Sequence, residues 1–256
     1  FVPTMGALHQ GHLSLISIAK KKNDVVVISI FVNPTQFDNE EDLEKYPQTI
    51  ENDRKLLESV DCDVLFVPTV KEIYNNNINS ERFDFDGLEH EMEGKFREGH
   101  FDGVGTIVKA FLEIIMPDVA YFGKKDFQQL QIVKKLVEKY NIPVKIKGRP
   151  IFREDDGLAM SSRNARLTKE HREVAPFIYK TLKKAKKKFG LKNIDELTKW
   201  VKKQFKKKPL LELEYFTIAD EKTLQTPENI ESSKSYRAFI AVFAGEIRLI
   251  DNIGLK

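Results

Sequence analysis

Short apolar runs alternate along the first part of the chain with longer segments in which apolar residues recur every three or four positions. Residues 25–32, Val-Val-Val-Ile-Ser-Ile-Phe-Val, are almost entirely apolar and mostly β-branched, which is typical of a strand buried on both faces. Similar runs predict strands at residues 1–2, 63–68, 119–122 and 144–147. The segments with helical spacing lie between them, at residues 13–19, 49–60, 107–115 and 130–137. This alternation predicts the α/β class, with a doubly wound parallel sheet over residues 1–152.

A second, smaller α+β domain is expected over residues 153–256. Residues 168–209 carry 15 Lys and Arg against 4 Asp and Glu. Their apolar residues recur at helical spacing, which predicts amphipathic helices with lysine-rich outer faces. Short strands are expected after them, at residues 214–218, 238–242 and 248–250.

Composition narrows the class of protein only a little. The chain has 256 residues, 41% of them hydrophobic, and this is enough for a substantial core. No apolar run approaches the roughly twenty residues of a membrane helix. A single cysteine excludes an internal disulfide and is consistent with the reducing environment of the cytoplasm. The net charge of +3 argues neither for nor against binding to nucleic acid. Because the chain begins inside a predicted strand, we expect a preceding segment to be missing, so the lack of a signal peptide carries little weight.

The first candidate site is the stretch 3–12, Pro-Thr-Met-Gly-Ala-Leu-His-Gln-Gly-His, between the first strand and the first helix. Gly6 allows a tight turn, and Gly11 leaves room for a ligand close to the backbone. His9 and His12 lie at the helix start, where free backbone N–H groups and the helix dipole favour an anion. Imidazole N–H groups add further donors, so the stretch predicts a phosphate site.

Two alternative roles for the histidine pair remain open. A His-x-x-His pair can be half of a zinc site, although a third or fourth ligand is needed and Cys62 has no Cys-x-x-Cys partner. Each histidine can also be a helix-capping or packing residue. The motif becomes specific only in combination with the rest of the chain.

Polar side chains follow the strand at residues 25–32. Pro34 cannot continue a central strand, so Asn33 and Gln36 are expected at its carboxyl end, where open α/β sheets bind ligands. The Gln36 amide suits a polar substrate, and it can equally tie a loop together.

The strand at residues 119–122 ends in the same way, before Gly123, Lys124, Lys125, Asp126 and Gln129. A lysine at this place is a point charge for phosphate, and Asp126 or Gln129 can hold hydroxyl groups. A glycine-rich, charged segment at residues 93–105 similarly presents Arg97 and His100 at a helix start, with His100 more simply explained as structural.

A third polar cluster lies in residues 157–164, Gly-Leu-Ala-Met-Ser-Ser-Arg-Asn. Two hydroxyls and a guanidinium in succession can bind polyphosphate oxygens from the side opposite the histidines. Taken alone, Ser-Ser-Arg-Asn is also an ordinary helix-capping turn. The acidic residues 38–48 are either a solvated loop or a lid over the site.

These motifs together resemble the pantothenate synthetase (pantoate–β-alanine ligase) family of the nucleotidyltransferase superfamily. His-Gln-Gly-His at 9–12 is similar to the His-x-Gly-His signature, and Met-Ser-Ser-Arg at 160–163 to the second phosphate-binding loop. Further similar segments are residues 31–37, 46–47, 97–101, 125–129 and 248–252.

Two segments depart from the family pattern. The chain has Gly-Lys-Lys-Asp at 123–126 where the family usually has Gly-Glu-Lys-Asp, and Arg-Glu-Gly-His at 97–100 where it has Arg-Pro-Gly-His. Both keep the matching Lys125, Asp126, Arg97 and His100, so the departures concern local loop geometry alone.

The resemblance implies a Rossmann-like domain of the nucleotidyltransferase type and an ATP-dependent ligase. Its reaction condenses (R)-pantoate with β-alanine to pantothenate, AMP and pyrophosphate through a pantoyl adenylate. It also implies Mg²⁺ accompanying ATP, held largely by phosphate and water, and a homodimer. A carboxylate is ionised at pH 7, so the first step needs positioning and charge neutralisation more than a base.

The resemblance also assigns roles to single residues. Catalysis is implied for His12, His9, Lys125 and Arg163. The substrate is assigned to Gln36, Gln129, Asn33 and Arg97, and no protein ligand is assigned to a metal. ATP is assigned to Met5, Gly6, Ala7, Leu8, His9, Gln10, Gly11, His12, Gly123, Lys124, Lys125, Asp126, Phe152, Met160, Ser161, Ser162 and Arg163.

Two rival functions fit the sequence less well. A small synthetase acting on tRNA would need more room for anticodon recognition than the second domain provides. A nucleic-acid-binding module could use the lysines of residues 168–209, but a solvated helix face with few exposed aromatics explains them more simply. We therefore expect pantoate and β-alanine as partners, without nucleic acid or membrane.

Overall fold

The computed structural model describes residues 1–37, 40–75 and 77–255. The chain divides into two compact units, Phe1–Pro150 and Ile151–Lys256, here called unit 1 and unit 2. The boundary expected from the sequence lies two residues further along, between residues 152 and 153.

Unit 1 contains parallel strands, as the alternating pattern predicts. They are β1 (Val2–Thr4), β2 (Val27–Ile30), β3 (Val64–Phe66), β4 (Val119–Gly123) and β5 (Lys145–Arg149). Phe1 N donates a hydrogen bond to Val119 O at 2.8 Å, and Tyr121 N donates one to Phe1 O at 2.9 Å. These bonds set β1 beside β4, so the strands lie in the order β3-β2-β1-β4-β5. From β1 the chain adds strands on one side of the sheet, β2 and then β3, and from β4 it adds strands on the other side. Open α/β sheets bind ligands at this point, between β1 and β4.

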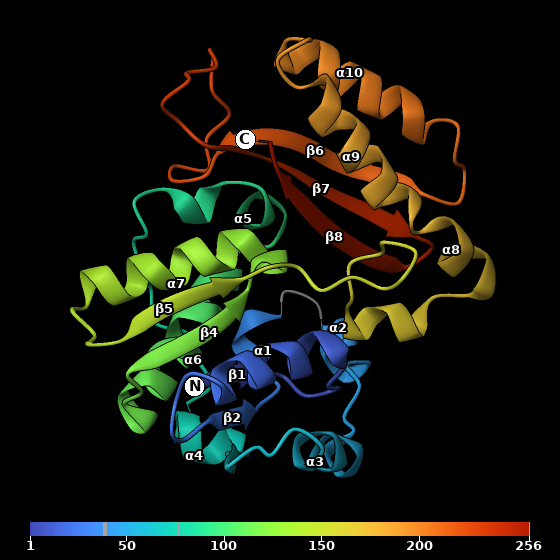
Figure 1. Ribbon diagram of the computed structural model, residues 1–256. Coiled ribbons are helices and arrows are strands. Elements are labelled where there is room, and N and C mark those ends of the chain that lie inside the picture. The colour runs from blue at the N-terminus through green and yellow to red at the C-terminus, as the bar shows by residue number, and fades with distance from the viewer. Residues whose placement is uncertain (38–39, 76, 256) are drawn as a thin grey trace. The chain divides into compact units, whose positions relative to one another are not determined.

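The helices of unit 1 connect these strands (Figure 1). They are α1 (Gln10–Lys20), α2 (Glu40–Glu44), α3 (Ile50–Glu58), α4 (Val70–Tyr74), α5 (Glu93–Phe96), α6 (His100–Ile115) and α7 (Phe127–Lys139), with short 3₁₀ helices η1 (Pro34–Gln36), η2 (Leu88–His90) and η3 (Lys124–Asp126). The buried residues Leu13 and Ile16 of α1 share one core cluster with Val2 of β1 and Ile28 of β2. This packing holds the start of α1 above the carboxyl end of β1.

Two segments of unit 1 differ in extent from the periodic patterns that predicted them. The strand expected at residues 25–32 is only Val27–Ile30, because β3 pairs with Val27–Ser29 alone and Val25 is exposed to solvent. Helix α6 begins at His100, where the sequence predicted a helix start, and it reaches the periodic segment at 107–115 through two glycines. A Cβ at one of these, Gly103, would lie 2.3 Å from Thr35 O, so the glycine allows α6 to touch η1.

Unit 2 is α+β, as predicted. Its antiparallel sheet consists of β6 (Glu212–Asp220), β7 (Tyr236–Ala244) and β8 (Ile247–Gly254), preceded by η4 (Ser162–Arg166), α8 (Lys169–Val174), α9 (Phe177–Lys188) and α10 (Ile194–Phe205). Figure 1 shows α9 and α10 along this sheet, and Leu182 and Leu197 of the two helices are buried in one cluster with Ile240 of β7. All three strands are longer than expected, because each continues as far as it has a hydrogen-bonded neighbour.

Candidate active site

The turn between β1 and α1 depends on a glycine with left-handed backbone. Gly6 has a φ of +82°, a conformation that residues with a Cβ rarely adopt. A Cβ there would also lie 3.0 Å from Ile30 Cγ2 and 3.1 Å from Asp53 Oδ2. The chain can therefore make this tight turn, and bring its next amides to the edge of the sheet, only with glycine at this position.

Asp53, which the sequence analysis missed, holds the same turn from helix α3. Its buried carboxylate accepts hydrogen bonds from Ala7 N at 2.9 Å, Leu8 N at 2.8 Å and Thr49 Oγ1 at 3.1 Å. The sequence pattern does indicate that Asp53 is buried. Asp53 lies on the face of α3 that also carries Leu57, so a carboxylate interrupts an apolar stripe. Such a residue needs polar partners in the interior.

His9 and His12 stand together at the start of α1, as predicted. His9 precedes the first helical residue and His12 lies in the first turn, and their rings stack with centroids 4.0 Å apart. The backbone N–H of His9 donates to His12 Nδ1 at 3.3 Å. Since Nδ1 accepts this bond, the hydrogen of a neutral His12 ring is on Nε2.

The His12 ring is neutral at pH 7. Burial lowers its pKa from 6.5 to about 3, with smaller contributions in the same direction from His9 and Lys125. Part of its surface nevertheless remains accessible. The ring can therefore offer a phosphate oxygen one N–H donor, and positive charge has to come from elsewhere.

Lys125 is the nearby source of that charge. It lies in η3, directly after β4, and is close enough for its charge to act on His12. Its Nζ is 3.4 Å from Asp126 Oδ1. Strands β1 and β4 are the neighbours at which the strand order changes direction. Their carboxyl ends thus bring together the neutral N–H donor of His12 and the positive charge of Lys125, the arrangement expected of a phosphate site.

Gln128 and Gln129, at the start of α7, differ in what they contact. Gln128 is buried and donates to Leu88 O at 2.8 Å and to Glu91 O at 2.7 Å, so it is structural. The half-buried Gln129 has no side-chain hydrogen bond among the residues described, which leaves its side-chain amide available to a ligand.

Gln36 is held on several sides. Its Nε2 donates to Met5 Sδ at 2.9 Å, which links η1 to the β1–α1 turn. Its backbone carbonyl accepts from His100 Nδ1 at 2.7 Å and from Arg97 at 3.2 Å. His100 thus has the structural role that the sequence analysis preferred, and it bonds to the residue expected to hold the substrate.

Asn33 and Arg97 also bond within the protein. The buried Asn33 amide donates to Gly103 O at 3.0 Å and to Gln36 Oε1 at 3.3 Å, and its oxygen accepts from Thr35 and Tyr74. Arg97 NH1 lies 3.2 Å from His100 Nε2. Both side chains therefore support Gln36, and their direct contact with a substrate stays a prediction.

In unit 2, the loop Met160 to Arg163 leads into η4. Ser161 Oγ accepts from Arg163 N at 3.3 Å, the helix-capping bond that the sequence pattern allowed. Ser162 and Arg163 keep part of their side chains accessible. Phe152 is exposed, and its carbonyl accepts from Met160 N at 3.0 Å. The loop is preformed and offers hydroxyl and guanidinium groups.

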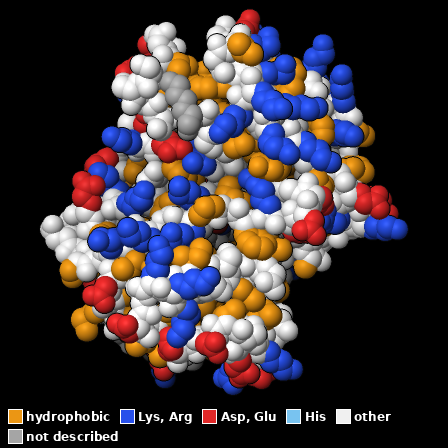
Figure 2. All heavy atoms as spheres, viewed as in Figure 1, with side chains coloured by type: hydrophobic (Ala, Val, Ile, Leu, Met, Phe, Trp, Pro, Cys, Tyr) orange, Lys and Arg blue, Asp and Glu red, His pale blue; other side chains and the backbone are white. Residues whose placement is uncertain are grey.

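The alternatives left open by the sequence find limited support. Within residues 1–37, 40–75 and 77–255 there is no group of three or more His, Cys, Asp or Glu that could hold a metal ion. Figure 2 shows Lys and Arg side chains gathered over the region of α9 and α10, where Lys183, Lys187 and Lys203 are exposed as expected of solvated helix faces.

Two further expectations concern a lid and a membrane. Residues 38 and 39 of the expected lid at 38–48 lie outside the described part of the chain, and Tyr46 within it is buried against Phe37. In the portion that the structure describes, none of the helices has the length and hydropathy required to cross a membrane.

The chain matches known proteins over its whole length. The family model described as pantoate-beta-alanine ligase matches residues 1–254. Proteins named pantothenate synthetase from Christiangramia forsetii and Flavobacterium psychrophilum are 57% and 58% identical, in alignments that cover 100% of this chain and 90% and 91% of theirs.

Solved structures agree with these matches. The pantothenate synthetase of Thermus thermophilus superposes with a TM-score of 0.93 at 38% identity, covering 100% of this chain and 92% of that one. The pantoate-beta-alanine ligase of Francisella tularensis, complexed with beta-gamma ATP and beta-alanine, gives a TM-score of 0.82 at 40% identity, covering 100% and 88%. With its motifs, fold and site in agreement, this chain belongs to the pantoate–β-alanine ligase family, ATP-dependent enzymes that join pantoate to β-alanine to give pantothenate.

Proposed function

We propose that this chain makes pantothenate in two steps, with its phosphate site at the starts of α1 and η3. A carboxylate oxygen of pantoate attacks the α-phosphorus of ATP, and the bond to the β-phosphate oxygen breaks to release pyrophosphate. The amine of β-alanine then attacks the acyl carbon of the adenylate and displaces AMP, its proton leaving to water or to a phosphate oxygen. The observation that carries this proposal is the hydrogen bond from His9 N to His12 Nδ1 at the start of α1, which leaves His12 Nε2–H as the donor for a phosphate oxygen.

In the first step the protein holds phosphate charge in place. The positive end of the α1 dipole attracts phosphate, His9 and His12 donate hydrogen bonds to phosphate oxygens, and Lys125 supplies positive charge. Protonating His12 at pH 7 would cost about 5 kcal/mol, so the ring acts as a fixed dipole. In unit 2, Ser161, Ser162 and Arg163 are further phosphate donors.

Gln36 and Gln129 hold pantoate. Gln36 is positioned by Met5, Asn33 and His100, so its amide can hold a substrate without first being ordered. The same amide contacts β-alanine in the second step. ATP enters with Mg²⁺ coordinated mainly by phosphate and water, because that ion keeps several waters and uses few protein ligands.

The proposal includes three properties of the whole enzyme. It acts in the cytoplasm, as the single cysteine suggests, and as a homodimer, which light scattering can measure. Residues 38–48 form a lid that keeps water from the adenylate. A variant with a shortened lid should release extra pantoate and AMP.

Pyrophosphate release is the deciding measurement. ATP alone should release none, ATP with pantoate should release pyrophosphate, and adding β-alanine should yield pantothenate and AMP. Pantoate labelled with ¹⁸O in its carboxylate should transfer one labelled oxygen to AMP. ADP and phosphate as products, or pyrophosphate release without pantoate, would rule the adenylate route out.

Variants connect the reaction to the site. His12→Ala should lower kcat/KM for ATP by roughly 10²- to 10³-fold, the typical loss of one preorganised donor. His90→Gln, which alters an exposed histidine of η2, is the matched control and should leave the rate unchanged. Equal rates for both variants would contradict the role given to His12.

A further inference from the structure

The loop proposed to bind phosphate in unit 2 is the continuation of a short hairpin. Arg153 and Ala159 pair as an antiparallel bridge, and Glu154 N donates to Leu158 O at 2.9 Å. The turn closes at Gly157, whose φ is +96°. The chain leaves this hairpin directly into Met160, so the hairpin decides where the serine and arginine side chains that follow are placed.

A bidentate ion pair ties the hairpin to strand β8. Arg153 NH1 lies 2.8 Å from Asp251 Oδ2, and Arg153 NH2 lies 2.9 Å from Oδ1. The Asp251 side chain is only 3% exposed. The guanidinium also lies 3.5 Å from the ring centroid of Tyr179, in α9. Two parallel hydrogen bonds and one stacked face leave the Arg153 side chain little freedom.

A second set of contacts joins the hairpin to η4. Arg172 of α8 lies 2.6 Å from both Glu154 Oε2 and Asp156 Oδ2. The amide of Asn164, the residue after Arg163, donates to Glu154 Oε1 at 2.6 Å and to Ala159 O at 3.1 Å. The hairpin and both ends of the phosphate loop thus belong to one polar assembly within unit 2.

We infer that Asp251 and Arg153 are positioning residues for ATP binding: their ion pair holds the loop Met160 to Arg163 in its binding conformation before ATP arrives. The inference rests on the proposed role of Ser161, Ser162 and Arg163 as phosphate donors. Serine hydroxyls are short, so a small displacement of the backbone removes their contacts. A loop ordered in advance also loses less conformational entropy when the nucleotide binds.

The competing possibility is that the ion pair between Arg153 and Asp251 stabilises the fold without affecting ATP binding. A second pair of an arginine and a carboxylate in unit 2 provides the matched control. Arg248 of β8 lies 2.9 Å from Glu214 of β6 through Nε and Oε2, with side chains 20% and 15% exposed. This pair has the same chemistry, lies on the same sheet and is also largely buried. It joins two strands of the sheet, whereas the Arg153–Asp251 pair joins a strand to the hairpin.

The experiment compares Asp251→Asn with Glu214→Gln in the full chain. For each variant, the KM of ATP is measured at saturating pantoate, the KM of pantoate at saturating ATP, and Tm without ligands. We expect Asp251→Asn to raise the KM of ATP roughly 10- to 100-fold, the usual effect of removing a residue that orients a ligand-binding group. The KM of pantoate should change less than about two-fold. Glu214→Gln should lower Tm and leave both KM values unchanged.

Arg153→Lys provides an independent variant if Asp251→Asn does not fold. It keeps the charge but loses the bidentate geometry, and it should also raise the KM of ATP alone. The inference is overturned if a folded Asp251→Asn or Arg153→Lys has the wild-type KM of ATP, or if both substrates' KM values rise equally. Pantoate-dependent pyrophosphate release by the unaltered enzyme is measured separately, so a failure here leaves the proposed function standing.

Discussion

At the scale of single residues, one hydrogen bond determines what His12 can do. The His9 amide occupies Nδ1, and burial together with Lys125 keeps the ring unprotonated. A histidine at such a site is often assumed to carry charge near neutral pH, but here the charge is on the lysine. Dividing the N–H donor and the positive charge between His12 and Lys125 suits a phosphate site, because a protonated His12 would lie close to the positive charge of Lys125.

The pKa of His12 leads to a prediction for its NMR titration. Because the pKa is lowered to about 3, the ring's ¹H–¹³C resonance should not shift between pH 8 and pH 5. Comparing the spectrum with that of His12→Gln identifies the resonance. A titration midpoint near 6.5 would show that the ring is solvated and would contradict the neutral donor.

The same shift affects stability. Below its usual pKa of 6.5 the unfolded chain binds a proton on His12 that the folded chain does not bind until about pH 3. The free energy of unfolding therefore falls as the pH drops through this window, by up to about 1.4 kcal/mol per pH unit from this group. His12→Gln should remove that part of the slope in urea titrations at pH 6, 5 and 4.

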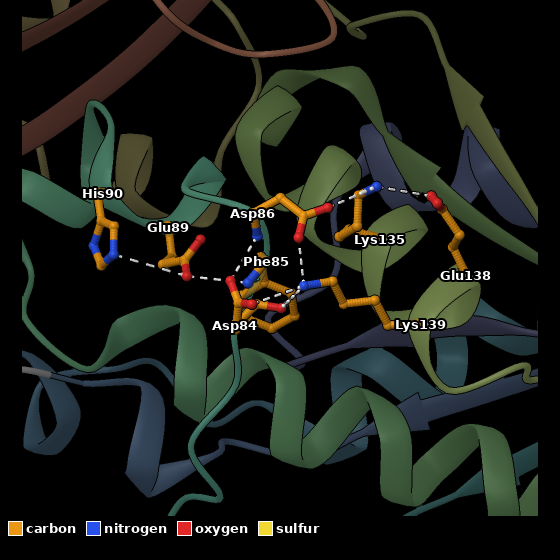
Figure 3. A network of polar contacts seen from close by, with 8 residues as sticks. All are labelled: Asp84, Phe85, Asp86, Glu89, His90, Lys135, Glu138 and Lys139. Atoms are coloured by element: carbon orange, nitrogen blue, oxygen red, sulfur yellow. Dashed lines mark hydrogen bonds and ion pairs between the residues drawn. The ribbon is translucent and has the colours of Figure 1, made fainter.

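At the scale of elements, the segment before α5 is attached to helix α7 by two different kinds of contact. Figure 3 shows Lys135 and Lys139 reaching from α7 toward Asp84 and Asp86, with Lys139 3.0 Å from Asp84 Oδ2 and Lys135 3.2 Å from Asp86 Oδ2. These carboxylates are exposed, so salt screens the pairs. The second attachment is the buried amide of Gln128.

We expect the buried amide to contribute more to stability than the ion pairs. Gln128 donates to Leu88 O and Glu91 O and accepts from Glu93 N at 3.0 Å, so Gln128→Leu removes three hydrogen bonds to backbone groups. The free energy of unfolding should fall by roughly 2 to 3 kcal/mol, independently of salt. Lys139→Gln should have a smaller effect that vanishes at high salt. Urea midpoints at low and high ionic strength measure both, and the reverse ranking would contradict this account.

At the scale of the whole molecule, the proposed function assigns phosphate donors to unit 1 and to unit 2, and ATP binding tests each assignment separately. We expect one ATP bound per chain, adding roughly 2.7 kcal/mol to the free energy of unfolding at about 100 times its Kd. His12→Ala in unit 1 and Arg163→Ala in unit 2 should each weaken this stabilisation. Calorimetric titration gives the stoichiometry, and an Arg163→Ala protein with unaltered ATP affinity would remove unit 2 from the site.

Local pattern was a good guide to the elements and to part of the site. The alternation of apolar runs with helical spacing predicted the parallel strands of unit 1, and the lysine-rich amphipathic segments with short strands after them predicted an α+β second domain. His9 and His12 were expected at a helix start because capping and helical spacing depend on neighbours a few residues away. Element ends were less accurate: β2 and α6 end or begin where strand pairing and the contact with η1 require.

Short-range periodicity in the sequence was enough to predict most strands and helices and the chemical groups at their ends, but not α4 and α5, where the pattern is irregular. How those groups are held depends on contacts that form only in the folded chain. Asp53 meets Leu8 across 45 residues, Asn33 meets Gly103 across 70, and Asp251 meets Arg153 across 98. Such contacts depend on strand order, helix packing and register, to which every part of a unit contributes at once, so no local window of sequence contains them.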